Sequence, residues 1–238
     1  MKRTTLLIIL LAVTLVLGGC VNLNAITGSG NVVSQEYDFA DFNEVDISHA
    51  FNATINPGDA YSVVVRVDDN LVDHLVVEQD GNRVSVGLEN GTIATRATME
   101  VDITMPILSR LNASGASRAQ LNTLPVDDNF TTEASGASQI HGDIDAVDID
   151  LNASGASTIF LAGTAGNVRA VASGASTIDL TELAAIDAQT DASGASTVIV
   201  NVEGILDADA SGGSNVFYLG SPEMGNIDTS GGAEVSQR

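Results

Sequence analysis

The chain has 238 residues but no tryptophan, one cysteine and three histidines. Lysine occurs once, at Lys2, and aromatic residues make up 4% of the sequence. A single cysteine excludes a disulfide within one molecule. The shortage of large side chains indicates a thin interior built from alanine, valine, isoleucine and glycine.

Acidic residues dominate the charge. Beyond Gly19, seven arginines stand against 31 acids, a net charge of −24. Such a surface repels nucleic acid and anionic lipid headgroups, so no nucleic-acid partner is expected. The composition leaves three explanations open: adaptation to a salty habitat, calcium binding, or drift in composition.

Residues 1–19 have the pattern of a signal peptide. Lys2 and Arg3 precede an apolar stretch that runs from Leu6 to Leu17. This stretch is too short for a membrane span, and small residues follow it, as a cleavage site requires. The sequence therefore predicts export and removal of residues 1–19.

Leu17-Gly18-Gly19-Cys20 resembles a bacterial lipobox, in which the cysteine becomes the new N-terminus and carries the lipid. We expect Cys20 to be the lipid attachment residue, which anchors the chain to the membrane, with residues 20–27 as a tether. The alternative is an ordinary secretory signal with a stray cysteine. Because Val21 rather than aspartate follows the cysteine, the outer membrane is favoured in a cell that has two membranes.

A short Ser-Gly-Ala/Gly motif recurs through the second half of the chain. The sequence numbers of its successive glycines differ by 21, 19, 19, 20, 18 and 19. A period this short and regular predicts a solenoid with about 19–20 residues per coil. The repeat glycines are Gly115, Gly136, Gly155, Gly174, Gly194, Gly212 and Gly231.

Side chains alternate within each repeat. From Leu151 to Leu161 every second residue is apolar or small, which predicts a strand of about eleven residues that continues through Gly155, followed by a shorter return segment. Ser154 is expected to point outward and Ser157 inward. A glycine column then marks a shared corner. The predicted fold is all-β, a single-stranded parallel β-helix, right-handed, with an N-terminal β-rich cap.

The segment before the repeats has conventional strand signals. We predict that residues 28–110 form the cap and the first coil, and that 111–238 form the repeat solenoid, as one continuous domain. The expected features are a strand over 61–67, a helical turn over 70–74 and a hairpin around Asp80-Gly81-Asn82. His49 is expected to stand in the glycine column of the first coil. An uncovered coil end could also recruit another chain, so self-association through the solenoid end is a further expectation.

No residue is predicted to be catalytic, and no cofactor is expected. Serine chemistry needs a nearby base, and His49, His74 and His141 do not form a recognisable motif with a repeat serine. A β-helix lyase needs basic residues beside carboxylates or calcium, whereas the arginines look scattered. The arginines concerned are Arg110, Arg118 and Arg169.

One outward column offers a candidate metal site. Residues three positions before each glycine should stack, which places Asp191, Asp209 and Asp228 together near the C-terminus, with Asp187 and Asp207 nearby. Calcium accepts carboxylate oxygens in flexible geometry, although the glycine-aspartate nonapeptides of calcium-loaded β-rolls are missing. A solvated acidic stripe is the simpler explanation. The other members of the column are Asn112, Glu133, Asn152 and Val171.

Three function classes remain open. A lipid anchor, a rigid rod and repeated faces favour a non-enzymatic structural or adhesin-like module that binds a surface glycan or protein. A polysaccharide-processing enzyme is the second. The third is a flat-face binder of an ordered lattice, either glycan or ice, suggested by three outward rows: Ser154/Ala156/Thr158, Ser173/Ala175/Thr177 and Ser193/Ala195/Thr197.

The chain also resembles a bacterial domain family, the "putative auto-transporter adhesin, head GIN domain". The resemblance covers about residues 28–225 and implies a β-helix-like fold on an exported, often lipidated protein, with no catalytic residues to transfer. His49 departs from the family pattern, where glycine is more common. The segments that carry the resemblance are 28–32, 42–51, 69–75, 84–88 and Met105-Pro106, followed by the Ser-Gly-Ala-Ser run.

Overall fold

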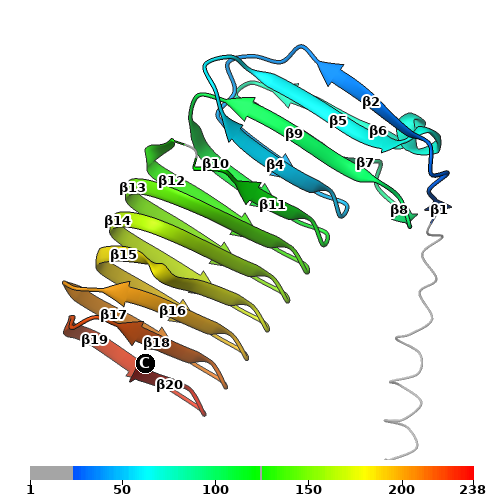
Figure 1. The fold of residues 1–238 in the computed structure, drawn as a ribbon. Coiled ribbons are helices and arrows are strands. Elements are labelled where there is room, and N and C mark those ends of the chain that lie inside the picture. Colours follow the sequence, from blue (N-terminus) through cyan, green and yellow to red (C-terminus); the bar gives the residue numbers. More distant parts are fainter. Residues whose placement is uncertain (1–23, 124) are drawn as a thin grey trace, which may run out of the picture.

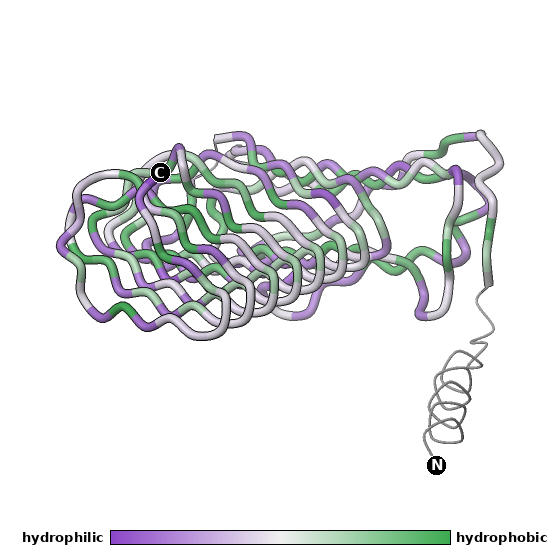
Figure 2. The backbone as a smooth tube through the Cα atoms, turned by 90° about the horizontal axis from the view of Figure 1, so that it is seen from below, coloured by the Kyte–Doolittle hydropathy of each residue, from purple (hydrophilic) through white to green (hydrophobic). Residues whose placement is uncertain are grey.

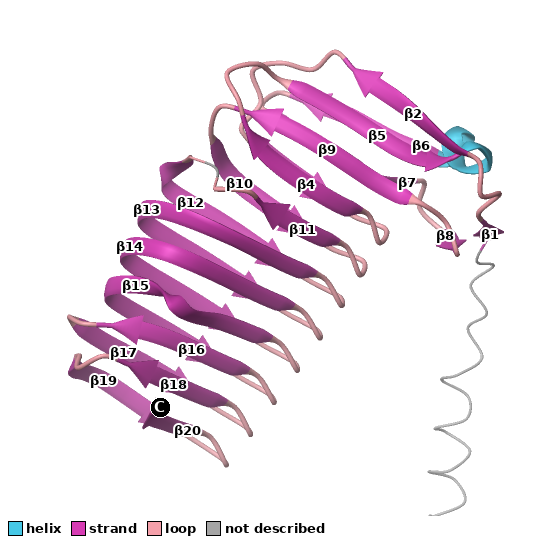
Figure 3. Ribbon diagram, viewed as in Figure 1, coloured by secondary structure: helices cyan, strands magenta, loops and turns pink. Residues whose placement is uncertain are grey.

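The structure is a computed structural model that describes residues 24–123 and 125–238. The predicted signal peptide and Cys20 lie outside these residues. Strands make up nearly all of the regular structure, and they form a β-solenoid of about seven turns, which confirms the predicted fold class (Figures 1 and 3). The single helical element in the described part is a 3₁₀ helix, η2 (Asp69–His74), where a helical turn was predicted.

The strands fall into an N-terminal group and a repeat group. The N-terminal group is β1 (Asn24–Thr27), β2 (Val32–Tyr37), β3 (Glu44–Ile47), β4 (Asn52–Pro57), β5 (Ser62–Asp68), β6 (Leu75–Asp80), β7 (Arg83–Leu88), β8 (Thr92–Thr95) and β9 (Met99–Met105). The repeat group is β10 (Leu108–Ala113), β11 (Arg118–Leu121), β12 (Val126–Ala134), β13 (Gln139–Ala153), β14 (Thr158–Ala172), β15 (Thr177–Ala192), β16 (Thr197–Val202), β17 (Ile205–Ala210), β18 (Asn215–Leu219), β19 (Glu223–Thr229) and β20 (Glu234–Gln237).

Each coil contributes one strand segment to each of two faces, and neighbouring coils pair in parallel (Figure 2). The first face precedes the glycine turn and contains β7, β3, β10, β12, the C-terminal halves of β13, β14 and β15, then β17 and β19. The second face follows the turn and contains β9, β4, β11, the N-terminal halves of β13, β14 and β15, then β16, β18 and β20.

The prediction of one long strand through the glycine was wrong. The strand ends at Ala153 and the next begins at Thr158, with Gly155 and Ala156 in a turn between them. Gly155 was expected to face inward but is exposed, because the two turn residues occupy the outside of the corner. The inward alternation resumes only at Ser157.

The repeat glycines do form the shared corner. Their φ angles lie between +62° and +76°, a region that side chains other than glycine adopt only with strain. A Cβ atom at Gly174 would lie 2.7 Å from the carbonyl oxygen of Gly155 in the preceding coil. That oxygen accepts a hydrogen bond of 2.7 Å from the backbone N–H of Ala175. The parallel hydrogen-bond ladder therefore continues around the corner, and each turn contacts the backbone of the turn in the preceding coil.

Inward serines complete this corner. Ser157 is buried, and its hydroxyl lies 2.8 Å from the carbonyl oxygen of Ser154 and 2.9 Å from that of Ala134. The same arrangement recurs in neighbouring coils at Ser138, Ser176, Ser196 and Ser214. The buried hydroxyls are therefore satisfied by backbone carbonyl oxygens at and beside the turn, as buried polar groups require.

The core between the two faces is thin and built from columns of like side chains. Beside the corner the interior column is alanine in six consecutive coils, and it continues to the buried Ile47 of the first coil. On the second face the equivalent column is isoleucine or valine. The alanine column is Ala113, Ala134, Ala153, Ala172, Ala192 and Ala210; the other is Ile140, Ile159, Ile178, Val198 and Val216.

Antiparallel strands cover the N-terminal end. β5 pairs with both β2 and β9, and β6 pairs with β7 in the predicted hairpin. β3 and β4 form the first coil between this cap and the repeats, with His49 at the glycine position and a φ of 58°. β1 occupies the second half of the segment predicted as a tether and pairs with β8. Within the described ranges, no helix has the length and apolar character that a membrane span requires.

The last coil is the most exposed part of the solenoid. β19 and β20 pair only with β17 and β18 among the described strands, and Met224 and Ile227 are exposed. Unpaired strand edges are templates for association.

We expect concentration-dependent self-association that increases with salt, because salt screens the acidic chains from one another. Sedimentation should show it, and Ile227→Asp should weaken it. A species that stays monomeric at low and high salt alike would contradict the expectation.

Candidate functional site: a groove on the first face

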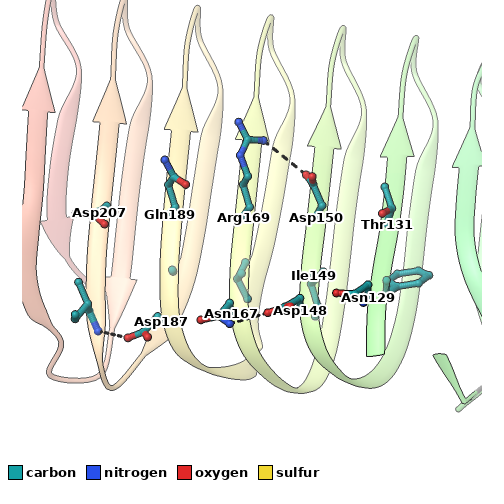
Figure 4. A pocket seen from close by; sticks show the side chains of 14 residues that line it. Asn129, Thr131, Asp148, Ile149, Asp150, Asn167, Arg169, Asp187, Gln189 and Asp207 are labelled. Atoms are coloured by element: carbon teal, nitrogen blue, oxygen red, sulfur yellow. Dashed lines mark hydrogen bonds and ion pairs between the residues drawn. The ribbon is translucent and has the colours of Figure 1, made fainter. Parts of the chain in front are cut away.

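A groove of about 570 Å³ runs across neighbouring coils of the first face (Figure 4). Two outward rows of side chains form its walls, and the strand backbone between them forms its floor. The arginine row is Thr131, Asp150, Arg169, Gln189 and Asp207. The second corner is the bend at which a coil passes from its second face to the first face of the next coil, near Val147 in β13. The amide row lies nearer this corner and consists of Asn129, Asp148, Asn167, Asp187 and Ile205.

The amide row is held by contacts between coils. The side-chain amide of Asn167 donates to Asp148 Oδ1 over 2.6 Å. The backbone N–H of Ile205 donates to Asp187 Oδ1 over 2.7 Å. Asp187 therefore satisfies a backbone N–H at the start of the next coil. Together with the Asn167–Asp148 bond, this contact fixes the side-chain positions in the amide row, which is one wall of the groove.

The arginine row carries the cationic side chain of the groove. Arg169 Nη1 lies 3.7 Å from Asp150 Oδ1, and both side chains are more than half exposed, so this ion pair contributes little to stability. Its guanidinium remains able to donate hydrogen bonds to a ligand. The arginine row therefore offers donors and acceptors on adjacent coils.

The arginines were expected to be scattered, and for two of them this was wrong. Strand register places Arg110 in the same outward row as Arg169, three coils earlier, because the spacing between them closely follows the repeat period. The row continues to Glu44 and Arg83 of the first coil and cap. Arg118 lies on the second face, where it bonds to Gln139. Applying the repeat period to charged residues would have found the row.

Glu44 forms ion pairs with the two arginines that flank it at the N-terminal end of this row, Arg83 and Arg110. Burial raises the pKa of its carboxyl, but hydrogen bonds from Arg83 and Asn82 lower it by more, so its pKa lies below the ordinary value. Arg83 Nη2 lies 2.7 Å from Glu44 Oε2. Because the folded-state pKa is depressed, the pair stabilises the fold at neutral pH, and this contribution is lost as the pH falls through that pKa.

Apolar side chains project beside the amide row. Val147 and Ile186 stand in one outward column at the second corner, where glycines occupy the alternate coils, and Ile186 is 62% exposed. Ile205 ends the amide row and is also exposed. The groove thus has polar walls and an apolar rim, a combination suited to ligands with both polar groups and hydrocarbon faces.

The predicted acidic column does come together. Asp191 pairs in register with Asp209, and Asp209 with Asp228, on the first face. Asp187 and Asp207 lie on other rows, where they accept backbone hydrogen bonds from Ile205 and from Asn226. Among the residues that the structure describes, no three His, Cys, Asp or Glu side chains are grouped to hold a metal ion. Calcium binding stays a prediction.

Calcium binding can be separated from charge screening by thermal unfolding. If calcium binds the column, millimolar calcium should raise the melting temperature well beyond sodium chloride at equal ionic strength. Asp209→Asn should abolish the difference. Identical responses to the two salts would leave a screened acidic stripe with no metal role.

The histidines serve local structure. His49 Nδ1 lies 2.8 Å from the Ser48 hydroxyl, so a histidine does adjoin a serine that precedes the corner, a contact the sequence did not reveal. The two residues are neighbours in the chain, and the backbone at His49 is left-handed. His74 pairs with Glu89, and the His141 and Phe160 rings lie 5.8 Å apart in a tilted arrangement.

The lattice-binding rows do not share a flat face. Ser154 ends the first face, Ala156 lies in the turn, and Thr158 begins the second face. The three columns therefore wrap around the corner, which removes the geometric basis for a flat array.

Sequence comparison decides the family. The family model described as "Putative auto-transporter adhesin, head GIN domain" matches residues 41–222. The chain belongs to this family. The resemblance inferred from its motifs is confirmed, and the family description suggests an extracellular or surface protein. A search of curated proteins found no match.

Solved structures support the same fold. A protein described as a putative adhesin from Bacteroides fragilis superposes with a TM-score of 0.84 at 20% identity, covering 90% of this chain and all of the other. One described as a putative lipid binding protein from Parabacteroides distasonis gives 0.71 at 19% identity over the same shares. A putative adhesin from Parabacteroides merdae gives 0.66 at 17% identity, covering 90% of this chain and 99% of the other.

Proposed function

We propose that this GIN-domain protein is a cell-envelope lipoprotein, anchored through Cys20, that acts as a non-enzymatic, adhesin-like binding module. The observation that carries the proposal is the groove, where outward polar side chains repeat from coil to coil. Family membership and structural neighbours described as adhesins support it.

The groove suits an extended ligand with repeated polar groups. Side chains on neighbouring coils stand about 4.8 Å apart, so a polymer lying along the solenoid axis could bond to several coils at once. Individually weak contacts then add through multivalency. The carboxylates repel anionic polymers, which favours a neutral surface glycan over an acidic one.

The repeat serines do not support an enzymatic function. Their inward hydroxyls are buried and bonded to turn carbonyls, where no substrate reaches them. In the groove itself, the polar side chains are carboxylates, amides, one threonine hydroxyl and one guanidinium. The activity proposed for these groups is recognition.

A glycan and cell-surface binding screen with the chain lacking Cys20 tests this function. We expect binding to at least one neutral glycan, and Arg169→Gln should weaken it several-fold. Arg118→Gln is the matched control, because it removes the same charge from the second face. Binding that both substitutions weaken equally would place the ligand elsewhere, and no binding to any surface polymer or cell would contradict the proposed function.

A further inference from the structure

The cap end of the molecule lies very close to Cys20. β1 begins at Asn24, four residues after the cysteine. A chain extends at most 3.3–3.6 Å per residue, so these two residues are separated by no more than about 14 Å in any conformation. The headgroup layer on each side of a bilayer is roughly 5–8 Å thick. A lipid on Cys20 therefore holds β1 at the membrane surface.

β1 is also fixed to the cap, so it cannot swing out as additional tether. It pairs with β8 over four positions. At its end, the side-chain amide of Asn70 donates to the carbonyl oxygen of Thr27 over 2.9 Å, and Gly28 N–H donates to that of Thr95 over 3.0 Å. Whatever holds β1 at the membrane holds the whole cap there.

The cap end carries side chains that suit a lipid surface. Ile93 of β8 is 40% exposed, and Val32 at the start of β2 is 50% exposed. Arg96, which directly follows β8, is exposed and forms no ion pair with any other described residue. Apolar side chains enter the headgroup boundary, and a guanidinium binds lipid phosphate.

We propose that the β1–β8 end of the solenoid rests on the bilayer and that the rod stands away from it, with β19 and β20 farthest out. The rod extends about 40 Å from β7 to β19, at roughly 4.8 Å per coil. Its acidic flanks are repelled by anionic lipids, which opposes lying flat. The groove then runs outward from the membrane, accessible to extended polymers.

This inference rests on the proposed lipidation of Cys20, but its test does not need the cell to lipidate the protein. Because Cys20 is the only cysteine, the mature chain can be coupled through it to a maleimide phospholipid in vesicles. Because the chain has no tryptophan, Ile93→Trp and Met224→Trp each introduce a single fluorescent reporter, one at each end.

Quenching by brominated lipids then measures which end touches the bilayer. We expect quenching at position 93 to exceed that at position 224 several-fold. Inserting about 30 glycine and serine residues between Cys20 and Asn24 adds a flexible span of about 30 Å and should remove most of the difference. Equal quenching at both positions with native spacing, or stronger quenching at 224, would overturn the inference. Intact mass of the membrane-extracted protein tests lipidation separately.

Discussion

Gly174→Val should lower the melting temperature by roughly 10 °C, a loss of about 3 kcal/mol or more. Gly174 has a φ of 75°, which strains any β-branched residue. Its Cβ would also lie 2.7 Å from the carbonyl oxygen of Gly155, which is backbone and cannot rotate away. The turn would have to move, and with it the hydrogen bond that Ala175 donates to Gly155.

Ala175→Val is the matched control, because it adds the same side chain one position later. Ala175 is exposed on the outside of the turn, and its φ is not positive. We expect a change of no more than about 0.5 kcal/mol, typical of surface substitutions. Thermal unfolding of the two variants measures the contrast, and equal melting temperatures would show that the corner tolerates a side chain.

The stacked columns could be predicted because two numbers define them. A period of about 19 residues gives the coil-to-coil neighbours, and alternation by two gives the inward and outward sides. Asp191, Asp209 and Asp228 were placed in one column in this way, and the strand register agrees. The inward position of Ser157 follows from the same alternation.

The path of the chain within one coil could not be predicted from these numbers. The turn interrupts the alternation at Gly155 and Ala156, but the inward residues on its two sides, Ala153 and Ser157, are an even number of positions apart, as they would be in a straight strand. A straight strand and a turn differ in the φ angle at Gly155, and the alternation of inward and outward residues does not determine that angle. The flat-face hypothesis failed for this reason, since Ser154 and Thr158 lie on opposite sides of the corner.

The groove was missed for a different reason. The position of its walls depends on the distance between the two corners of a coil. It also depends on which outward rows lie on either side of the backbone that forms the floor of the groove. The apolar rim depends on glycines alternating with Val147 and Ile186 in one column. Local insertions also shift the register, as between Phe160 and Gly163 where β14 meets β15. Composition alone does not reveal such a shift.

The solenoid should tolerate loss of a whole coil but not of half a coil. Deleting residues 156–174 joins Gly155 to Ala175 and restores a Ser-Gly-Ala-Ser corner. β15 would then pair with β13 in the place that β14 occupies. Ile178 would take the position of Ile159 next to Ile140, so the interior column would again contain isoleucine at this level. Repeat proteins of this kind are stabilised mainly by contacts between nearest neighbours, which the deletion preserves.

We therefore expect the whole-coil deletion to unfold cooperatively in urea, with an m-value smaller by roughly a tenth because less surface is exposed on unfolding. The control removes residues 156–165 and joins Gly155 to Gly166, so that one coil lacks its second-face strand. That chain cannot complete the coil. On the second face, β13 and β15 would lose the segment of β14 that pairs with both of them. It should show no cooperative transition and should aggregate through the exposed strand edges. If both deletions abolish cooperative unfolding, the coils are not the independent stacking units that their register indicates.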